Sequence, residues 1–150
     1  EYIRSKMDPA PEEKNPDGTL KPKVFFGIDV IAGLPGETDE LFMETYNFLK
    51  DRIKPAFIHI FPYSKRPGTR SAARKDKWQD CVKTKRVEML EALGDSLHRD
   101  FVEASRGVKE TVLFEDDCKN GIMGGYTGNY IRVERPWDPT LAGKLTEVIL

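Results

Sequence analysis

Two short segments hold most of the side chains that could bind a ligand or RNA. The first, residues 61–69, reads Phe-Pro-Tyr-Ser-Lys-Arg-Pro-Gly-Thr and ends an apolar run. Ligands of α/β proteins sit at the carboxyl ends of strands, so Tyr63, Ser64 and Arg66 are placed to face a site. A guanidinium such as that of Arg66 can hold a carboxylate or phosphate through two parallel hydrogen bonds. The alternative is that Tyr63 packs on the next helix and Arg66 lies in solvent.

The second segment, residues 125–133, reads Gly-Tyr-Thr-Gly-Asn-Tyr-Ile-Arg-Val. Its aromatic and polar side chains stand close together: Tyr126, Asn129, Tyr130 and Arg132. Aromatic rings beside Asn and Arg can stack on bases and contact phosphates. Residues 106–150 carry six basic and seven acidic side chains, a net charge of −1, which weakens this interpretation. A structural β domain with an aromatic core is the alternative.

The strongest local charge lies in residues 65–86, which we call the basic block. It has nine basic and two acidic side chains, a net charge of +7. The basic residues are Lys65, Arg66, Arg70, Arg74, Lys75, Lys77, Lys83, Lys85 and Arg86. Such a block attracts a phosphate backbone, and it is equally typical of a solvated loop and helix start. We include Arg70 and Arg74 among the predicted RNA-binding residues.

A glycine-rich turn, Gly33-Leu-Pro-Gly-Glu-Thr38, follows the first apolar run. It is neither a Walker loop nor a G-x-G-x-x-G motif. Glu37, Asp39 and Glu40 would repel a phosphate at this helix start, so an anion site is excluded. The turn is either a tight connection with an ordinary acidic first turn or a site for a cationic or amino-bearing ligand.

No catalytic or metal-binding set is predicted. His59 and His98 have no partner at catalytic or metal-ligand spacing, and Cys81 and Cys118 are too far apart for a C-x-x-C site. Two isolated cysteines favour a reducing compartment, and we expect the cytoplasm. The sequence contains no apolar run of membrane-spanning length, and we expect no signal peptide.

The first half of the chain predicts a strand–helix–strand unit. Residues 24–32 are expected to form a strand buried on both faces, and residues 56–61 a second strand. Between them, Thr38 is a good N-cap for a helix that runs to about Lys54. A crossover helix implies parallel strands. Two strands cannot form a stable sheet alone, so further strands are expected from elsewhere in the protein or from a partner.

The second half changes pattern. A long helix is expected over residues 78–105, with Gly94 as a position where it could bend and Gly107 as its end. Short strands with Gly and Asp turns then predict a small antiparallel barrel. Residues 8–22, rich in proline and charge, are expected to form a loop.

Two long motifs carry a resemblance to a known family. Asp29-Val-Ile-Ala-Gly-Leu-Pro-Gly-Glu-Thr38 and His59-Ile-Phe-Pro-Tyr-Ser-Lys-Arg-Pro-Gly-Thr-Arg-Ser-Ala-Ala73 resemble the last part of the radical-SAM barrel of the methylthiotransferases. The helix and β tail resemble the link to the TRAM domain of those enzymes and the domain itself. The resemblance begins at about Val24, and the loop at 8–22 is longer than is usual in the family.

The resemblance implies an α/β plus β fold. Residues 1–77 would form the C-terminal βα units of a partial radical-SAM, TIM-like barrel, residues 78–105 the linking helix, and residues 106–150 a small antiparallel TRAM β-barrel. The chain would be a C-terminal piece, which agrees with its lack of an initial Met. The parent enzyme would add a methylthio group at C2 of a modified adenosine beside the tRNA anticodon.

The implied cofactors are S-adenosylmethionine and two 4Fe-4S clusters, whose cysteine ligands, including a C-x-x-x-C-x-x-C motif, are absent from this sequence. The piece alone is therefore expected to be inactive. The residues implied for cofactor binding are Val30, Ile31 and Gly33 at the adenosyl pocket, with Tyr63, Ser64 and Arg66 at the barrel mouth. The tail residues implied for binding the tRNA anticodon stem-loop are Arg106, Lys109, Tyr126, Asn129, Tyr130 and Arg132.

Three branches of the family are distinguished by short motifs. Arg-Pro-Gly-Thr at residues 66–69 disfavours the branch that acts on a ribosomal protein. Residues 125–130, Gly-Tyr-Thr-Gly-Asn-Tyr, are similar to the branch that acts on N6-threonylcarbamoyladenosine, although Gly128 stands where that branch usually has Asp. The remaining alternatives are the isopentenyladenosine branch, a non-catalytic RNA-binding module, and self-association of the fragment through its half-sheet.

Overall fold

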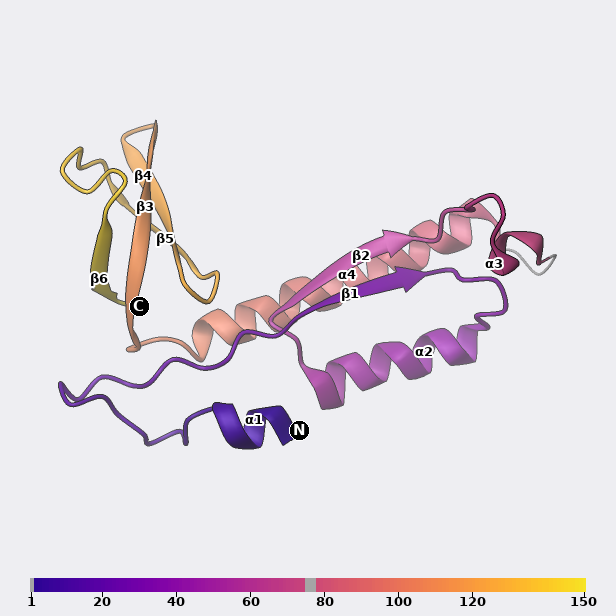
Figure 1. Cartoon of the computed structure of the whole chain (residues 1–150), viewed down its shortest axis with the longest axis horizontal. Helices are drawn as coiled ribbons and strands as arrows, with labels where there is room; N and C mark the ends of the chain where they lie inside the picture. Colours follow the sequence, from indigo (N-terminus) through magenta and orange to yellow (C-terminus); the bar gives the residue numbers. More distant parts are fainter. Residues whose placement is uncertain (1, 75–77) are drawn as a thin grey trace. The chain divides into compact units, whose positions relative to one another are not determined.

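The computed structural model describes residues 2–74 and 78–150. The chain divides into two compact units. The first, which we call the β unit, consists of Glu1–Phe25 and Val102–Leu150, and the second, the α/β unit, consists of Phe26–Phe101. Figure 1 labels their helices and strands. Lys75 and Lys77 of the basic block lie outside the described residues.

The α/β unit begins with a strand–helix–strand repeat (Figure 1). Its elements are β1 (Gly27–Ala32), α2 (Asp39–Phe48), a π-helical turn η1 (Leu49–Ile53) and β2 (Phe57–Pro62). The strands are parallel, and Ala32 at the end of β1 lies opposite Pro62 at the end of β2. The predicted βαβ unit is thus confirmed, and both carboxyl ends lie at one edge of the sheet. The helices α3 (Arg70–Ala73) and α4 (Asp80–Glu103) follow.

Local signals in the sequence explain where α2 begins and where the helical segment ends. The hydroxyl of Thr38 accepts a hydrogen bond from the Leu41 amide at 3.3 Å, which confirms the predicted N-cap. Asp39 and Glu40 occupy the first turn, where they favour the helix dipole. At the other end Lys54 takes a left-handed conformation and donates its amide to the Leu49 carbonyl at 2.7 Å.

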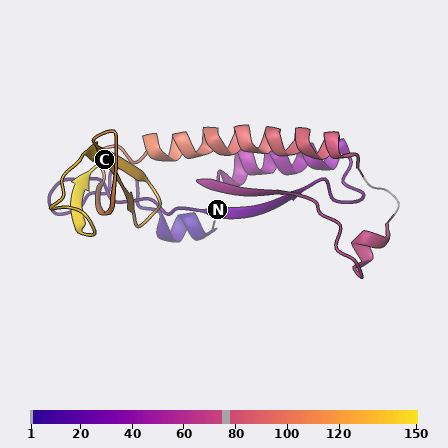
Figure 2. The same cartoon turned by 90° about the horizontal axis from the view of Figure 1, so that it is seen from above.

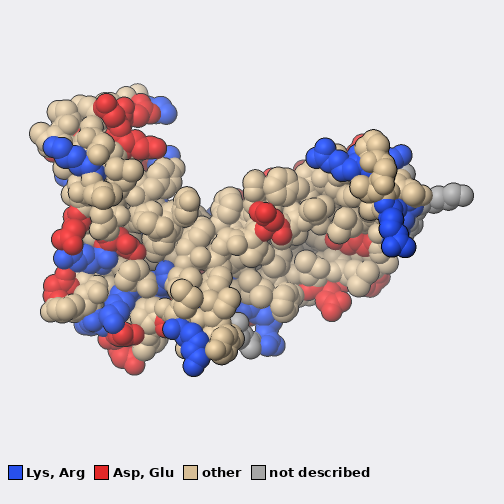
Figure 3. Space-filling model, viewed as in Figure 1, with Lys and Arg blue, Asp and Glu red and all other residues tan. Residues whose placement is uncertain are grey.

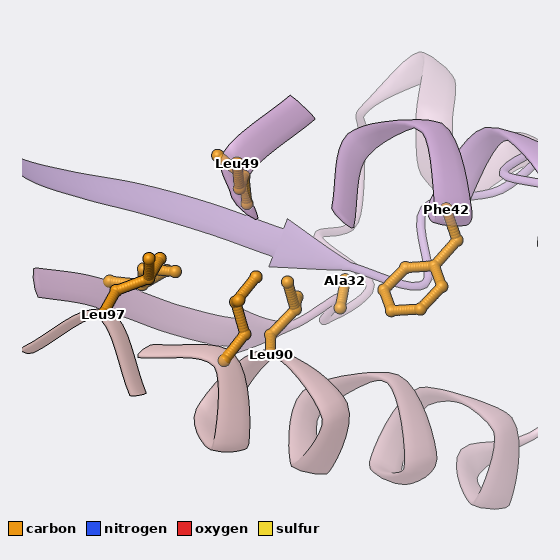
Figure 4. Packing of buried hydrophobic residues seen from close by; sticks show 7 residues of the cluster. Ala32, Phe42, Leu49, Leu90 and Leu97 are labelled. Carbon is orange, nitrogen blue, oxygen red and sulfur yellow. The ribbon is translucent and has the colours of Figure 1, made fainter. Parts of the chain in front are cut away.

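One face of the two-stranded sheet is covered by helices. Figure 2 shows α2 and α4 on the same side of β1 and β2. Figure 4 shows the core that results, made of Ala32, Phe42, Leu49, Ile58, Leu90, Leu93 and Leu97. The opposite face carries exposed apolar side chains: Ile31 is 49%, Phe57 49% and Phe61 41% exposed. The prediction that the first strand is buried on both faces is therefore wrong for the described chain, because helices cover only one face.

Helix α4 passes through Gly94 without a break. A Cβ at Gly94 would lie 3.7 Å from the Cβ of Ile58, an ordinary packing distance. Gly94→Ala should therefore stabilise the α/β unit by about 1 kcal/mol, because alanine loses less backbone entropy in a helix. Urea denaturation of the two proteins measures this directly. A destabilised variant would show that the helix needs closer contact with β2 than the distance suggests.

The β unit holds a four-stranded antiparallel sheet. Its strands are β3 (Lys109–Lys119), β4 (Ile122–Thr127), β5 (Arg132–Pro136) and β6 (Leu145–Ile149), in the order β5-β4-β3-β6. The sheet is curled into a half-barrel (Figure 2). The prediction of a small antiparallel barrel is thus confirmed for the antiparallel sheet, while the described strands form an open order rather than a closed barrel. Val112, Phe114 and Met123 form its core and are 0% exposed.

The N-terminal segment packs within the β unit. Helix α1 (Tyr2–Met7) is followed by residues 8–22, which form only isolated bridges, one of them between Leu20 and Val108. The ammonium nitrogen of Lys109 lies 3.1 Å from a carboxylate oxygen of Asp17 and 3.1 Å from a carboxylate oxygen of Glu147. From the sequence we grouped residues 1–25 with the barrel; in the structure these contacts place them with the β sheet.

Asp17 fixes the loop of residues 8–22 to the β sheet through Lys109, and the pKa of its carboxyl group is lowered. Its carboxylate accepts from the Thr19 hydroxyl at 2.6 Å and the Thr19 amide at 3.0 Å. These bonds and Lys109 lower the pKa of Asp17 from 3.8 to about 2. Because the pKa is lower in the folded state, the ionised carboxyl stabilises the folded state above pH 3.8, and this stabilisation is lost as the pH falls through about 2. Carboxyl-carbon NMR should show Asp17 titrating near pH 2, whereas a midpoint near 4 would mean that the loop is undocked in solution.

None of the helices in the described parts of the chain is both long enough and apolar enough to cross a bilayer.

Candidate functional site

A pocket of about 450 Å³ opens at the carboxyl ends of β1 and β2. Its walls include Ile31, Leu34, Phe61, Tyr63, Ser64 and Arg66. Four of the six residues proposed for cofactor binding, Ile31, Tyr63, Ser64 and Arg66, are thus brought to one cavity. They come from two segments about thirty residues apart in sequence, and they meet because parallel strands end at the same edge.

The other two proposed cofactor residues lie elsewhere. Val30 packs against the core between the sheet and the helices, because alternate residues of a strand face opposite sides. Gly33 has a left-handed φ of +80°, its amide donates to the Glu37 carboxylate at 2.7 Å, and a Cβ there would fall on the side chain of Lys83. Gly33 therefore serves the turn and the close approach of α4.

The pocket lining suits a ligand with both apolar and polar parts. Ile31, Leu34 and Phe61 supply apolar surface, and Ser64 and Arg66 supply a hydroxyl and a guanidinium. S-adenosylmethionine, with a flat base and charged ends, fits this chemistry. An iron–sulfur cluster does not fit: the chain has only two cysteines, and the described residues contain no group of three His, Cys, Asp or Glu side chains that could hold a metal.

The acidic turn before α2 is neutralised from within the unit. Arg86 of α4 donates to the Glu37 carboxylate at 2.6 Å, to the Glu37 carbonyl at 3.0 Å and to the Asp39 carboxylate at 2.7 Å. Its side chain is 3% exposed, and the Glu37 side chain is 14% exposed. Two of the three carboxylates are thus already paired with Arg86, so they hold the turn as a tight connection and are not free to bind a cationic group of a ligand.

Part of the basic block forms an exposed cationic loop next to the pocket. Lys65, Arg66 and Arg70 are exposed at the β2–α3 connection, and Arg74 is exposed beyond them. Figure 3 shows basic side chains gathered over this end of the α/β unit. Arg86 is buried, and Lys83 pairs with Asp80 at 2.7 Å. Among the described residues, the block therefore offers fewer exposed, unpaired charges than its sequence suggests: they include Lys65, Arg66 and Arg70 in the loop and Lys85 on α4.

In the β unit, Tyr126 and Arg132 face each other across β4 and β5. Tyr126 is 40% exposed, and the same cross-strand row continues through Leu113, 48% exposed, to Leu145, 71% exposed. This row of aromatic, cationic and apolar side chains is a surface on which bases could stack. Leu113 and Leu145 were not among the predicted residues, although the alternation in β3 indicates that Leu113 faces away from Val112 and Phe114.

The β4–β5 turn holds Asn129 and Tyr130 in different roles. The Thr127 hydroxyl donates to the Asn129 side chain at 2.6 Å, and the Asn129 amide group donates to the Lys23 carbonyl at 3.5 Å. Tyr130 has a φ of +62°, is 68% exposed and lies with its ring centroid 5.5 Å from that of Phe25. Asn129 therefore shapes the turn, while Tyr130 is presented to solvent.

Arg106 and Lys109 already have acidic partners. Arg106 lies 2.6 Å from Glu103, and this carboxylate raises the pKa of Arg106. Asp17 and Glu147 raise the pKa of Lys109 in the same way. Because both charges are compensated, they contribute less to attracting a phosphate than Lys65, Arg66 and Arg70 do, which have no acidic partner among the described residues.

No protein-family model matches the chain. It is 40% identical over 124 residues to the threonylcarbamoyladenosine tRNA methylthiotransferase MtaB of Bacillus subtilis, which covers 80% of this chain and 27% of that protein. It is 37% identical over 130 residues to MtaB of Aquifex aeolicus, covering 87% of this chain and 30% of that protein.

A relative whose name gives a different substrate matches a shorter stretch. The tRNA-2-methylthio-N(6)-dimethylallyladenosine synthase of a Wolbachia pipientis strain is 41% identical over 97 residues, covering 65% of this chain and 22% of that protein. The chain thus spans between about a fifth and a third of the length of these curated relatives.

Proposed function

Because the chain belongs to the MtaB/MiaB-like family of tRNA methylthiotransferases, we propose that it is part of an enzyme that adds a methylthio group to C2 of N6-threonylcarbamoyladenosine next to the tRNA anticodon. The observation that carries this proposal is the 40% identity over 80% of the chain. The pocket at the strand ends, rimmed by Arg66 and an exposed cationic loop, supports it.

The residues of this chain would have different roles according to their position. Ile31, Leu34 and Phe61 would hold the apolar part of S-adenosylmethionine, and Ser64 and Arg66 its polar ends. The cofactor would supply the radical and group-transfer chemistry when bound. Lys65, Arg66, Arg70 and Arg74 would attract RNA phosphates. The cluster ligands must come from other cysteines, so this chain alone should not catalyse the reaction.

The β unit would bind the anticodon stem-loop through Tyr126, Tyr130 and Arg132. The first two are exposed aromatic side chains, which can stack on unpaired bases. Asn129 would act indirectly, by shaping the turn that presents Tyr130. We place the protein in the cytoplasm, because both of its cysteines are free and exposed thiols, as is usual in a reducing compartment.

The second candidate substrate is isopentenyladenosine in tRNA. It is favoured by the 41% identity to the dimethylallyladenosine synthase of Wolbachia. The threonylcarbamoyladenosine branch is preferred for two reasons. Over 124 to 130 residues its relatives from Bacillus subtilis and Aquifex aeolicus are 40% and 37% identical, whereas two dimethylallyladenosine synthases that match 130 and 132 residues are 32% and 34% identical. In addition, Gly-Tyr-Thr-Gly-Asn-Tyr at residues 125–130 is similar to the motif of that branch.

Mass spectrometry of tRNA nucleosides, from cells with and without the gene, tests the proposal. Loss of the 2-methylthio form of threonylcarbamoyladenosine, with a rise of its precursor, is expected. Loss of the isopentenyl form instead would select the second candidate. If neither nucleoside changed, the branch that acts on a ribosomal protein or a non-catalytic RNA-binding module would become the leading interpretation.

Replacing Arg66, Arg70 and Arg74 together by alanine should weaken binding to a tRNA anticodon stem-loop. The slope of log affinity against log salt should fall by about 2 to 3, since three phosphate contacts are removed. Fluorescence anisotropy at several salt concentrations measures both quantities. The matched control removes three other exposed charges, at Lys50, Arg99 and Lys144. Equal losses in the two variants would mean that net charge alone decides binding.

A further inference from the structure

The guanidinium of Arg86 is held by aromatic rings and carboxylates, as is typical of an arginine that fixes the position of its neighbours. Its guanidinium carbon lies 4.5 Å from the centroid of the Trp78 ring and 5.2 Å from that of Phe42. The same group donates to both Glu37 and Asp39. A guanidinium that contacts two aromatic rings and donates to two carboxylates has little freedom to move, because a change of its position would break several contacts at once.

The partner that Arg86 holds is itself part of the turn after β1. The Glu37 carboxylate that accepts from Arg86 at 2.6 Å also accepts from the Gly33 amide at 2.7 Å. Leu34, which forms part of the pocket wall, lies between these two residues. A displacement of Glu37 would therefore move Leu34.

The neighbouring turn of α4 holds the loop after β2. Lys83 packs over Gly33, and its ammonium group lies 3.5 Å from the Tyr63 carbonyl. Arg86 and Lys83 stand three residues apart, so they project from the same face of the helix. The first turns of α4 therefore contact both loops that form the pocket.

We propose that Arg86 is a positioning residue for the pocket: through Glu37 it fixes the Gly33–Thr38 turn, and with it the wall that receives the cofactor. This inference rests on the proposed function for the identity of the ligand, S-adenosylmethionine. It assigns a ligand-binding consequence to a residue that does not line the cavity.

The test uses the intact enzyme that contains this segment, with the double variant Arg86→Met and Glu37→Gln. The double change removes the tether to α4 without leaving a buried charge, and the new glutamine can still accept from the Gly33 amide. Arg99→Met is the matched control, because Arg99 is an exposed arginine on the same helix. Three quantities are measured: melting temperature, affinity for S-adenosylmethionine by calorimetry, and hydrogen exchange of residues 33–38.

The double variant should melt close to the wild type, bind S-adenosylmethionine about tenfold more weakly and exchange the turn amides about tenfold faster. Arg99→Met should match the wild type in all three. Unchanged affinity and exchange in a folded double variant would overturn the proposal. If the double variant unfolds, Arg86→Lys, which lacks the two-pronged guanidinium, provides the same comparison.

An error in the proposed function would give a different result from an error in the role of Arg86. If the wild-type enzyme binds no S-adenosylmethionine, the cofactor assignment is wrong, and the ligand role of Arg86 is wrong with it. Hydrogen exchange of the turn would still measure whether Arg86 holds residues 33–38 in place.

Discussion

Arg86→Met alone should lower the free energy of unfolding of the α/β unit by about 3–5 kcal/mol. The single change leaves the Glu37 carboxylate, which is 14% exposed, without its ionic partner. Burying an unpaired charge costs far more than losing an exposed ion pair, because water cannot replace the missing partner. The Asp39 side chain is 79% exposed and loses little, because water solvates it.

The two tryptophans make this measurement specific to one unit. Trp78 lies in the α/β unit beside Arg86, and Trp137 packs on the core of the β unit. Urea denaturation followed by fluorescence, in a Trp137→Phe background, reports the α/β unit through Trp78. Arg99→Met serves as the control and should change stability by less than about 0.5 kcal/mol. A loss below about 1 kcal/mol for Arg86→Met would mean that water reaches Glu37 in solution.

Gly125→Ala should destabilise the β unit by about 3 kcal/mol. A Cβ at Gly125 would lie 2.6 Å from the Cγ1 of Val112 and 2.7 Å from the backbone carbonyl oxygen of Leu113. The carbonyl belongs to the neighbouring strand, so it can move only if the β3–β4 pairing shifts. Thermal denaturation followed by Trp137 fluorescence, in a background without Trp78, measures the effect.

The adjacent glycine supplies the control for this prediction. A Cβ at Gly124 would meet only the end of the flexible Arg132 side chain, at 3.3 Å. Gly124→Ala should therefore change stability by less than about 0.5 kcal/mol. Equal losses at the two positions would show that the glycines matter for strand flexibility and that the close contact at Gly125 does not decide the cost.

Much of the fold could be predicted from short-range signals. The N-cap Thr38 and the apolar run of β2 are local features, and they predicted the helix start and the second strand. Burial of both faces of β1 was a wrong prediction, because a continuous apolar run does not say whether a second layer is present. The N-terminal segment was also grouped differently, since the contact of Asp17 with Lys109 joins residues far apart in sequence.

The same difference between short-range and long-range signals applies to the candidate site. Tyr63, Ser64 and Arg66 were found because strand ends are recognisable in the sequence and parallel strands bring their ends together. The role of Arg86 was missed, because it pairs with Glu37 across 49 positions of sequence and had been counted as part of a basic block. Leu113 joins Tyr126 only through the register of β3 and β4, which no short motif encodes.

The uncovered face of the two-stranded sheet has a consequence for handling the protein. Residues 56–61 form a β-prone run without a formal charge, and its Phe57 and Phe61 side chains are exposed. Such a run can template cross-β stacking between chains at high concentration. Pro55 and Pro62 bracket it and act as gatekeepers, since neither has an amide hydrogen to donate to a neighbouring strand. Replacing either proline would lengthen the segment available for stacking, so aggregation should begin at lower protein concentration.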